Sequence, residues 1–230
     1  MSGVLVNVLS YVGFGLLVVS VLALVIWRGA RRDRGLQTAA ASLGMSYARR
    51  DDAPLASVAG LKVSDAIGVR SLANVAAGTI AGSRVWLLDY RYSQRPVGTV
   101  ERCGFSACVL QDDRLDLPHF RLASRGRPRS MTLSPIVHRP DDDPEVPLDG
   151  CSELERDFVL FTRTPDAVVP LLGPALQERL EAIWKPYLEI EGRGGLLAVT
   201  RRSWIEPNDA RALLEQASWI LDDLRRACSR

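Results

Sequence analysis

The stretch RVWLLDYRY, residues 84–92, has the alternation of side chains that is typical of a β-strand. Successive side chains of a strand point to opposite faces of the sheet, so these residues divide into two sets. The even-numbered set contains the aromatic side chains: Trp86, Leu88, Tyr90 and Tyr92. The odd-numbered set mixes apolar and charged side chains: Val85, Leu87, Asp89 and Arg91. We interpret the even face as core rather than as a ligand groove, because aromatic strand faces are usually buried.

Further strands are predicted on both sides of this stretch. Residues 74–80 precede it and join it through a turn at 81–83, and residues 99–110 alternate again after it. Phe120 and Leu122 indicate a fourth strand. The first half of the chain therefore predicts an antiparallel meander.

The region ahead of the strands is expected to contain one short helix. Apolar residues over 36–43 fall on one helical face, and Gly44 is suited to end the helix. Residues 48–70 are predicted to be irregular, because aspartates and a proline mark a turn there.

The second half begins after a long loop. Residues 126–150 contain five prolines and the acidic run Asp141–Asp143. A strand at 158–162 follows, and Thr164 with Pro165 is a good start for a helix that continues in a second piece over 174–184.

The chain is expected to end in a hairpin and a helix. Residues 187–191 and 196–201 flank Gly192–Gly195, which suits a hairpin turn better than a phosphate-binding loop, since no helix follows directly. A helix from Pro207 carries a broad apolar face. The class is α+β: an N-terminal transmembrane helix followed by a mainly antiparallel sheet packed with a few helices.

The transmembrane prediction rests on residues 4–27, which contain no charge and 19 apolar residues. A helix of that length rises about 36 Å, enough to cross a hydrocarbon core of about 30 Å. A cleaved signal peptide would have basic residues ahead of a shorter apolar stretch, and the first 27 residues contain no lysine or arginine. The segment therefore indicates an uncleaved anchor in contact with the lipid bilayer.

The flank of the apolar segment predicts its orientation. Four arginines follow it and no basic residue precedes it: Arg28, Arg31, Arg32 and Arg34. By the positive-inside rule the N-terminus lies outside the cell membrane and the domain lies in the cytoplasm. We expect these arginines to sit among anionic lipid headgroups as a stop-transfer flank rather than to form a specific lipid site.

The charge balance argues against nucleic-acid binding. The chain has 29 basic and 27 acidic residues, and residues 28–34 account for four of the bases and one of the acids. The remaining 25 bases and 26 acids give residues 35–230 a net charge of −1, so the usual basic footprint is missing.

Residues 1–34 are thus predicted to be the anchor and its basic flank. Residues 35–125 form a short helix plus antiparallel strands, 126–150 a proline-rich acidic loop, and 151–230 a strand, helix, hairpin and C-terminal helix. We expect 35–125 and 151–230 to form one globular unit.

Short motifs along the strands resemble a known family. The residues are Asn74, Val75, Gly78, Thr79, Gly82, Asp89, Tyr90 and Tyr92, and later the run Leu188–Gly192. With the proline that starts the last helix, they are similar to uncharacterised single-pass membrane-anchored proteins of actinobacteria over roughly residues 36–225. The resemblance implies an α+β domain on a hydrophobic anchor, and it brings no assigned activity, cofactor or catalytic residue.

Candidate metal ligands are few. Cys103 and Cys108 have a spacing seen in zinc sites, but they point to opposite faces of a strand, and Cys151 and Cys228 are distant single residues. We interpret the cysteines as small thiols of a reducing compartment and expect no metal or cofactor.

Candidate catalytic residues are equally sparse. His119 and His138 are the two histidines, and His119 is expected to point outward beside Arg121. Asp89 and Glu101 are candidates for a carboxylate pair, although a charged outer sheet face is the more ordinary interpretation.

A final candidate is a run of arginines just past the middle of the chain. Arg121, Arg125, Arg127 and Arg129 are either a basic patch at the membrane or a solvated loop, and we favour the loop.

Two function classes follow. The first is a membrane-anchored interaction or regulatory module with a protein partner. The alternative is a membrane-tethered enzyme such as a hydrolase, which predicts that Asp89 and Glu101, or His119, converge in a pocket.

Overall fold

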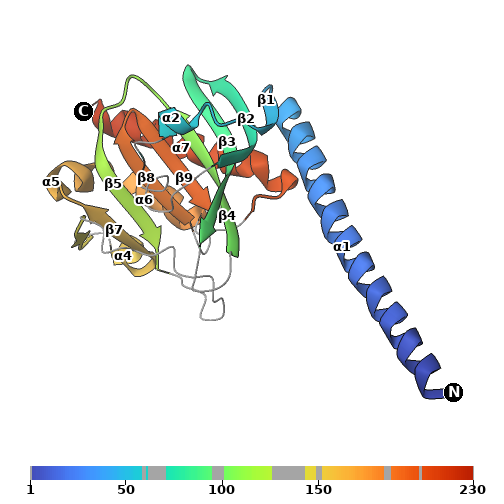
Figure 1. Ribbon diagram of the computed structural model, residues 1–230. Coiled ribbons are helices and arrows are strands. Elements are labelled where there is room, and N and C mark those ends of the chain that lie inside the picture. Colours follow the sequence, from blue (N-terminus) through green and yellow to red (C-terminus); the bar gives the residue numbers. More distant parts are fainter. Residues whose placement is uncertain are drawn as a thin grey trace.

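A long N-terminal helix projects from one edge of an α+β domain (Figure 1). The structure is a computed structural model, and it describes residues 2–58, 61, 71–94, 101–125, 143–148, 152–183, 188–201 and 204–229. Predictions for His138, Cys151, Arg127 and Arg129 lie outside these residues.

Helix α1 is continuous from Ser2 to Ser42. The helix predicted over 36–43 is therefore its last part and not a separate element, because no proline interrupts the chain between it and the apolar segment. Gly44 ends it with a φ of 70°, as expected for a glycine at a helix C-terminus. From Gly13 onward α1 is long and apolar enough to cross a membrane.

Within the described residues, nine strands form one antiparallel sheet. They are β1 (Ser46–Arg50), β2 (Ser71–Ile80), β3 (Ser83–Gln94), β4 (Glu101–Gln111), β5 (Leu117–Ser124), β6 (Glu145–Val146), β7 (Phe158–Thr162), β8 (Leu188–Gly194) and β9 (Leu196–Arg201). Their order across the sheet is β1-β2-β3-β4-β9-β8-β5-β7-β6.

The order corrects two predictions. Residues 48–70 are predicted to be irregular, but residues 48–50 belong to β1 and Leu55–Val58 form the short helix α2. The strand at Phe120 exists, but it does not continue the meander, since β9 and β8 lie between β4 and β5. A meander puts sequence neighbours side by side, whereas here the C-terminal hairpin is inserted between them.

The remaining helices pack on the face of the sheet that also contacts the end of α1. They are α4 (Ser152–Asp157), α5 (Pro165–Val168), the 3₁₀ turn η1 (Val169–Leu171), α6 (Pro174–Ile183), the 3₁₀ turn η2 (Pro207–Asp209) and α7 (Ala210–Cys228). The apolar face predicted for the last helix is buried there, including Leu213, Ile220 and Leu224. Thr164 precedes α5 as predicted, although its side chain makes no capping hydrogen bond.

The opposite face has its own apolar cluster, and it confirms the aromatic face of β3 as core. Trp86 and Tyr90 are buried in it, with Tyr90 stacked on Phe105 at 4.8 Å between ring centroids. Val58 from α2 packs against the same cluster.

The predicted hairpin turns are confirmed by the backbone. Ala81 and Gly82 both have positive φ, as a two-residue hairpin turn requires, and Gly194, the last residue of β8, has a φ of 53°. Gly192 lies opposite Phe120, whose ring occupies the place that a Cβ at 192 would need.

Candidate functional site between the N-terminal helix and the sheet

Asp89 lies at the centre of a buried polar network. It is on the odd face of β3, toward α1, and is 1% exposed. Its carboxylate accepts hydrogen bonds from the guanidinium of Arg32 at 2.8 and 3.1 Å and from Asn74 Nδ2 at 2.7 Å. Ser106 Oγ, directly opposite on β4, donates a further one. A buried carboxylate is tolerated only with such pairing, and this one is bound from three elements.

A β-bulge places Asn74 at this site. The register of β2 against β3 shifts between Ala73 and Ala76, and Asn74 there has a φ of 49°. Asparagine is among the residues that tolerate this left-handed conformation. Its Nδ2 reaches Asp89, while its Oδ1 accepts a 2.7 Å hydrogen bond from the Tyr47 hydroxyl.

Arg32 ties α1 to the sheet and to the segment before η2. Besides binding Asp89, its Nε donates to the carbonyl of Ile205 at 3.0 Å. The amide of Ile205 in turn donates to Ser106 Oγ at 2.8 Å, which closes the network. The guanidinium also lies 5.2 Å from the ring centroid of Trp204. Arg32 thus has partners in β3, Trp204 and Ile205, and its charge is neutralised by Asp89.

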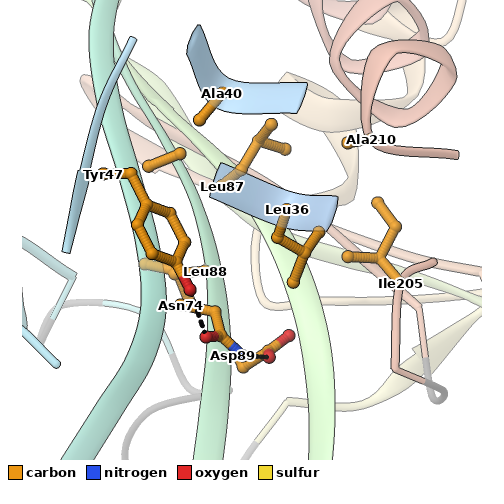
Figure 2. Close-up of a pocket in the computed structure, with 10 residues that line it drawn as sticks. Leu36, Ala40, Tyr47, Asn74, Leu87, Leu88, Asp89, Ile205 and Ala210 are labelled. Carbon is orange, nitrogen blue, oxygen red and sulfur yellow. Dashed lines mark hydrogen bonds between the residues drawn. The ribbon is translucent and has the colours of Figure 1, made fainter. Parts of the chain in front are cut away.

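A small cavity adjoins the network (Figure 2). Leu36 and Ala40 of α1 close it on one side, and Tyr47, Asn74 and Asp89 lie on the other. The space open to a water-sized sphere is about 20 Å³, which is room for about one water. The site is therefore a packing contact between α1 and the sheet and is too small to be a substrate pocket. Burial, with the nearby charges of Asp33 and Asp89, raises the pKa of the Tyr47 hydroxyl.

A second polar cluster surrounds His119 on β5. Its Nδ1 lies 3.2 Å from Asp143 and its Nε2 lies 3.1 Å from Glu191, and both carboxylates are buried. His119 is thus half-buried rather than pointing into solvent, because the side chains of Asp143 and Glu191 lie against both of its ring nitrogens. A ring with both nitrogens facing carboxylates has no lone pair turned toward a substrate.

A third cluster centres on Asp112, just after β4. It accepts hydrogen bonds from Arg114 and from Arg225 of α7, the latter at 2.7 Å. The hydrogen bonds from Arg114, with those from Arg225, hold the pKa of Asp112 well below its usual range. An open groove of about 320 Å³ lies beside it, with Arg84 and Asp113 in its wall.

The predicted carboxylate pair is wrong. In the register of β3 and β4, Asp89 faces Ser106 and Glu101 faces Gln94, five residues further along. Five residues in a strand span about 17 Å, too far for one site. The alternative of a charged outer face is wrong too, since Asp89 points to the helix-covered face and pairs with an arginine 57 residues away.

The arginine predictions are also corrected. Arg121 is 7% exposed and stacks over Phe161, so it belongs neither to a solvated loop nor to a basic patch. Arg125 is exposed, and its Nε donates to two backbone carbonyls. Arg32 is held by Asp89, which removes it from the flank expected to meet lipid headgroups. Each of these residues found a specific internal partner that no local pattern indicates.

Cys108 is a buried free thiol, and this burial raises its pKa. Cys228 is exposed. Among the described residues, no three His, Cys, Asp or Glu side chains are arranged to hold a metal ion.

Sequence reasoning missed the Arg32–Asp89 pair, although a signal was present. Asp89 follows the apolar Val85 and Leu87 on one face of its strand, and Arg32 precedes Leu36 and Ala40 at helical spacing. A charge at a core position of one element and an opposite charge at a core position of another indicate a buried pair.

Comparison with known proteins gives a fold relationship. No protein-family model and no curated protein matches the chain. The chain is similar to the crystal structure of the mycobacterial trehalose monomycolate transport factor A, TtfA. The similarity has a TM-score of 0.57 and 15% sequence identity, and covers 85% of this chain and 93% of that one.

Proposed function

We propose that this chain is a membrane-anchored interaction module that serves as a factor in transport at the membrane rather than as an enzyme. The observation that carries the proposal is the Arg32–Asp89 clamp, which fixes the helix leaving the apolar segment to the centre of the sheet. A domain whose orientation on its anchor is fixed presents one chosen surface to a partner in the same membrane. The fold that it shares with a transport factor agrees with this class.

The clamp also supports an anchor that is retained. A signal peptidase that cut at or beyond Arg32 would leave Asp89 buried without its guanidinium. Breaking a buried ion pair in this way costs about 3–5 kcal/mol. Residues 1–34 are thus proposed as an anchor that folds together with 35–230 as one unit, on the pattern of the actinobacterial membrane-anchored proteins that the sequence resembles.

The hydrolase alternative has less support. Its carboxylate pair does not converge, and His119 faces carboxylates on both nitrogens. Binding is therefore the better-supported class of activity.

The proposed topology has the N-terminus outside and the domain in the cytoplasm, with Arg28, Arg31 and Arg34 among anionic headgroups. Cys228 offers a direct test because its thiol is exposed. A membrane-impermeant maleimide is expected to label it only after cells are permeabilised, with Cys228→Ser giving the background. Labelling of Cys228 in intact cells would contradict this topology and indicate that the domain lies outside the cell membrane.

The binding role is tested by purifying the full chain from gently solubilised membranes. We expect an integral-membrane transport component to be recovered in near-equal amount with the wild type and with Arg31→Ala. Arg32→Ala keeps the apolar segment but loses the clamp, and it is expected to recover less. Equal recovery with Arg32→Ala would show that the clamp does not matter for binding, and no recovered component with any bait would contradict the proposal.

A further inference from the structure

Two tryptophans are exposed in the described part of the chain beyond α1, and they differ in where they lie. Trp204 is 41% exposed and Trp219 is 44% exposed. Each ring is covered on one side by an arginine, Trp204 by Arg32 and Trp219 by Arg179. Trp204 lies beside α1, whereas Trp219 lies on α7, which runs from η2 away from α1 toward the other side of the domain (Figure 1).

Trp204 is held in place by the clamp. The guanidinium 5.2 Å from its ring is bound by Asp89, and the same guanidinium binds the carbonyl of the next residue, Ile205. The charge of Arg32 is already compensated by Asp89, so placing the Trp204 ring at a membrane interface does not leave the Arg32 charge without a counter-ion.

The position of Arg32 along α1 sets the height of Trp204 above the apolar segment. Arg32 is five residues beyond Trp27, so it lies about 7.5 Å further along the helix axis. The headgroup region on each side of a bilayer is about 5–8 Å thick. With Trp27 at the edge of the hydrocarbon core, Trp204 is at the level of the headgroups.

That level is where tryptophan is most favourable, because its ring is apolar and its indole N–H needs a polar partner. Arg28, Arg31 and Arg34 are exposed on the adjoining part of α1 and complement anionic headgroups. The exposure of Trp204, its fixed position, its height above the apolar segment and the positive charge beside it all fit contact with a lipid surface.

We propose that Trp204 is a second membrane contact, which seats the domain on the headgroup layer beside its anchor. The inference rests on the proposed function, since it requires residues 4–27 to span the bilayer. One contact fixes the depth of α1, and a second contact off its axis fixes the rotation and tilt of the sheet above the membrane. Together they determine which face of the domain a membrane partner meets.

The test uses the full chain in vesicles of phosphatidylcholine and phosphatidylglycerol, with and without a lipid that carries a quenching spin label on its headgroup. Tryptophan emission is measured in a Trp27→Phe background, which removes the quenching due to the apolar segment. We expect quenching to persist in that background and to fall to the level of unlabelled vesicles when Trp204→Phe is added. Trp219→Phe, matched in exposure and in its arginine neighbour, is expected to leave the quenching unchanged.

Two outcomes would overturn different statements. If the chain floats with the vesicles and Trp27 is quenched, but Trp204→Phe changes nothing, the seating of Trp204 is wrong and the anchor stands. If the wild-type chain neither floats nor shows a quenched Trp27, the membrane-spanning segment itself is wrong, and the seating of Trp204 fails with it. Circular dichroism of each variant shows that the fold is retained, since Trp204 and Trp219 are both at the surface.

Discussion

Two buried aspartates on the same sheet are bound by arginines from the two long helices. Asp89 on β3 binds Arg32 of α1, and Asp112 after β4 binds Arg225 of α7. Each also has a serine on a neighbouring strand, Ser106 for Asp89 and Ser83 for Asp112. The N-terminal and C-terminal helices are thus attached to the sheet by the same chemistry.

The two attachments differ in what supports them. Helix α7 buries a long apolar face against the sheet, and Asp112 has Arg114 as a second cation. Among the described side chains of α1, Leu36 and Ala40 are buried against the domain and Ala39 and Leu43 are partly buried there. The same ion pair is therefore an addition to good packing in α7 and a main determinant of position in α1, which teaches that its importance depends on its neighbours.

The largest expected effect comes from removing the α1 clamp. Arg32→Ala leaves Asp89 buried without a cation, and we expect a loss of about 3–5 kcal/mol in the free energy of unfolding. Chemical unfolding in detergent micelles measures it. Arg31→Ala is the control, because Arg31 lies over Trp27, and a surface change there is expected to stay within about 0.5 kcal/mol. Adding Asp89→Asn to Arg32→Ala should recover stability, and failure to do so would mean that the buried charge is not the cause.

The matching change in α7 should cost less. Arg225→Ala removes one cation from Asp112 while Arg114 and the apolar face of α7 remain, so we expect about 1.5–3 kcal/mol. The adjacent Arg226, which pairs with Asp223 one turn away and is mostly exposed, is the control. A loss for Arg225→Ala equal to that for Arg32→Ala would remove the contrast between the two helices.

The contact between α1 and the turn η2 can be tested at a glycine. A Cβ at Gly35 would lie 2.5 Å from Pro207 Cγ, so Gly35→Ala should push α1 away from η2 and cost about 1–3 kcal/mol. Gly29 is also in α1 and has no atom within 4 Å of the place of its Cβ. Thermal unfolding of Gly29→Ala should therefore show no loss, and a similar loss in both variants would place the cause in the helix itself.

The smallest effect is a pH dependence at Asp112. Its pKa is lowered in the folded protein, so its contribution to stability is present above the unfolded pKa of about 4 and is lost as the pH falls below that value. Melting temperatures measured between about pH 5 and pH 3 should fall less steeply for Asp112→Asn than for the wild type. Parallel curves would contradict the assignment.

Local patterns were sufficient for most of the strands and for the last helix. The alternation in β3, the positive-φ turn at Gly82 and the apolar face of α7 each depend on residues close together in the chain. The order of the strands was not predictable in the same way, because pairing β9 with β4 requires contacts between residues about 90 positions apart. The candidate site could not be predicted for the same reason, since Arg32, Asp89 and Ile205 come from three distant parts of the chain.

The sequence by itself determined the apolar segment, the α+β class and the buried aromatic face of β3, because hydrophobic periodicity and burial act on neighbouring residues. Only the tertiary structure decided that Asp89 pairs with Arg32, that His119 lies between Asp143 and Glu191, and that Trp204 lies beside α1. A charged side chain is compatible with solvent or with any opposite charge that the fold brings near. Its partner is selected by the packing of whole elements, and here that packing joins the helix that leaves the apolar segment to the centre of the sheet.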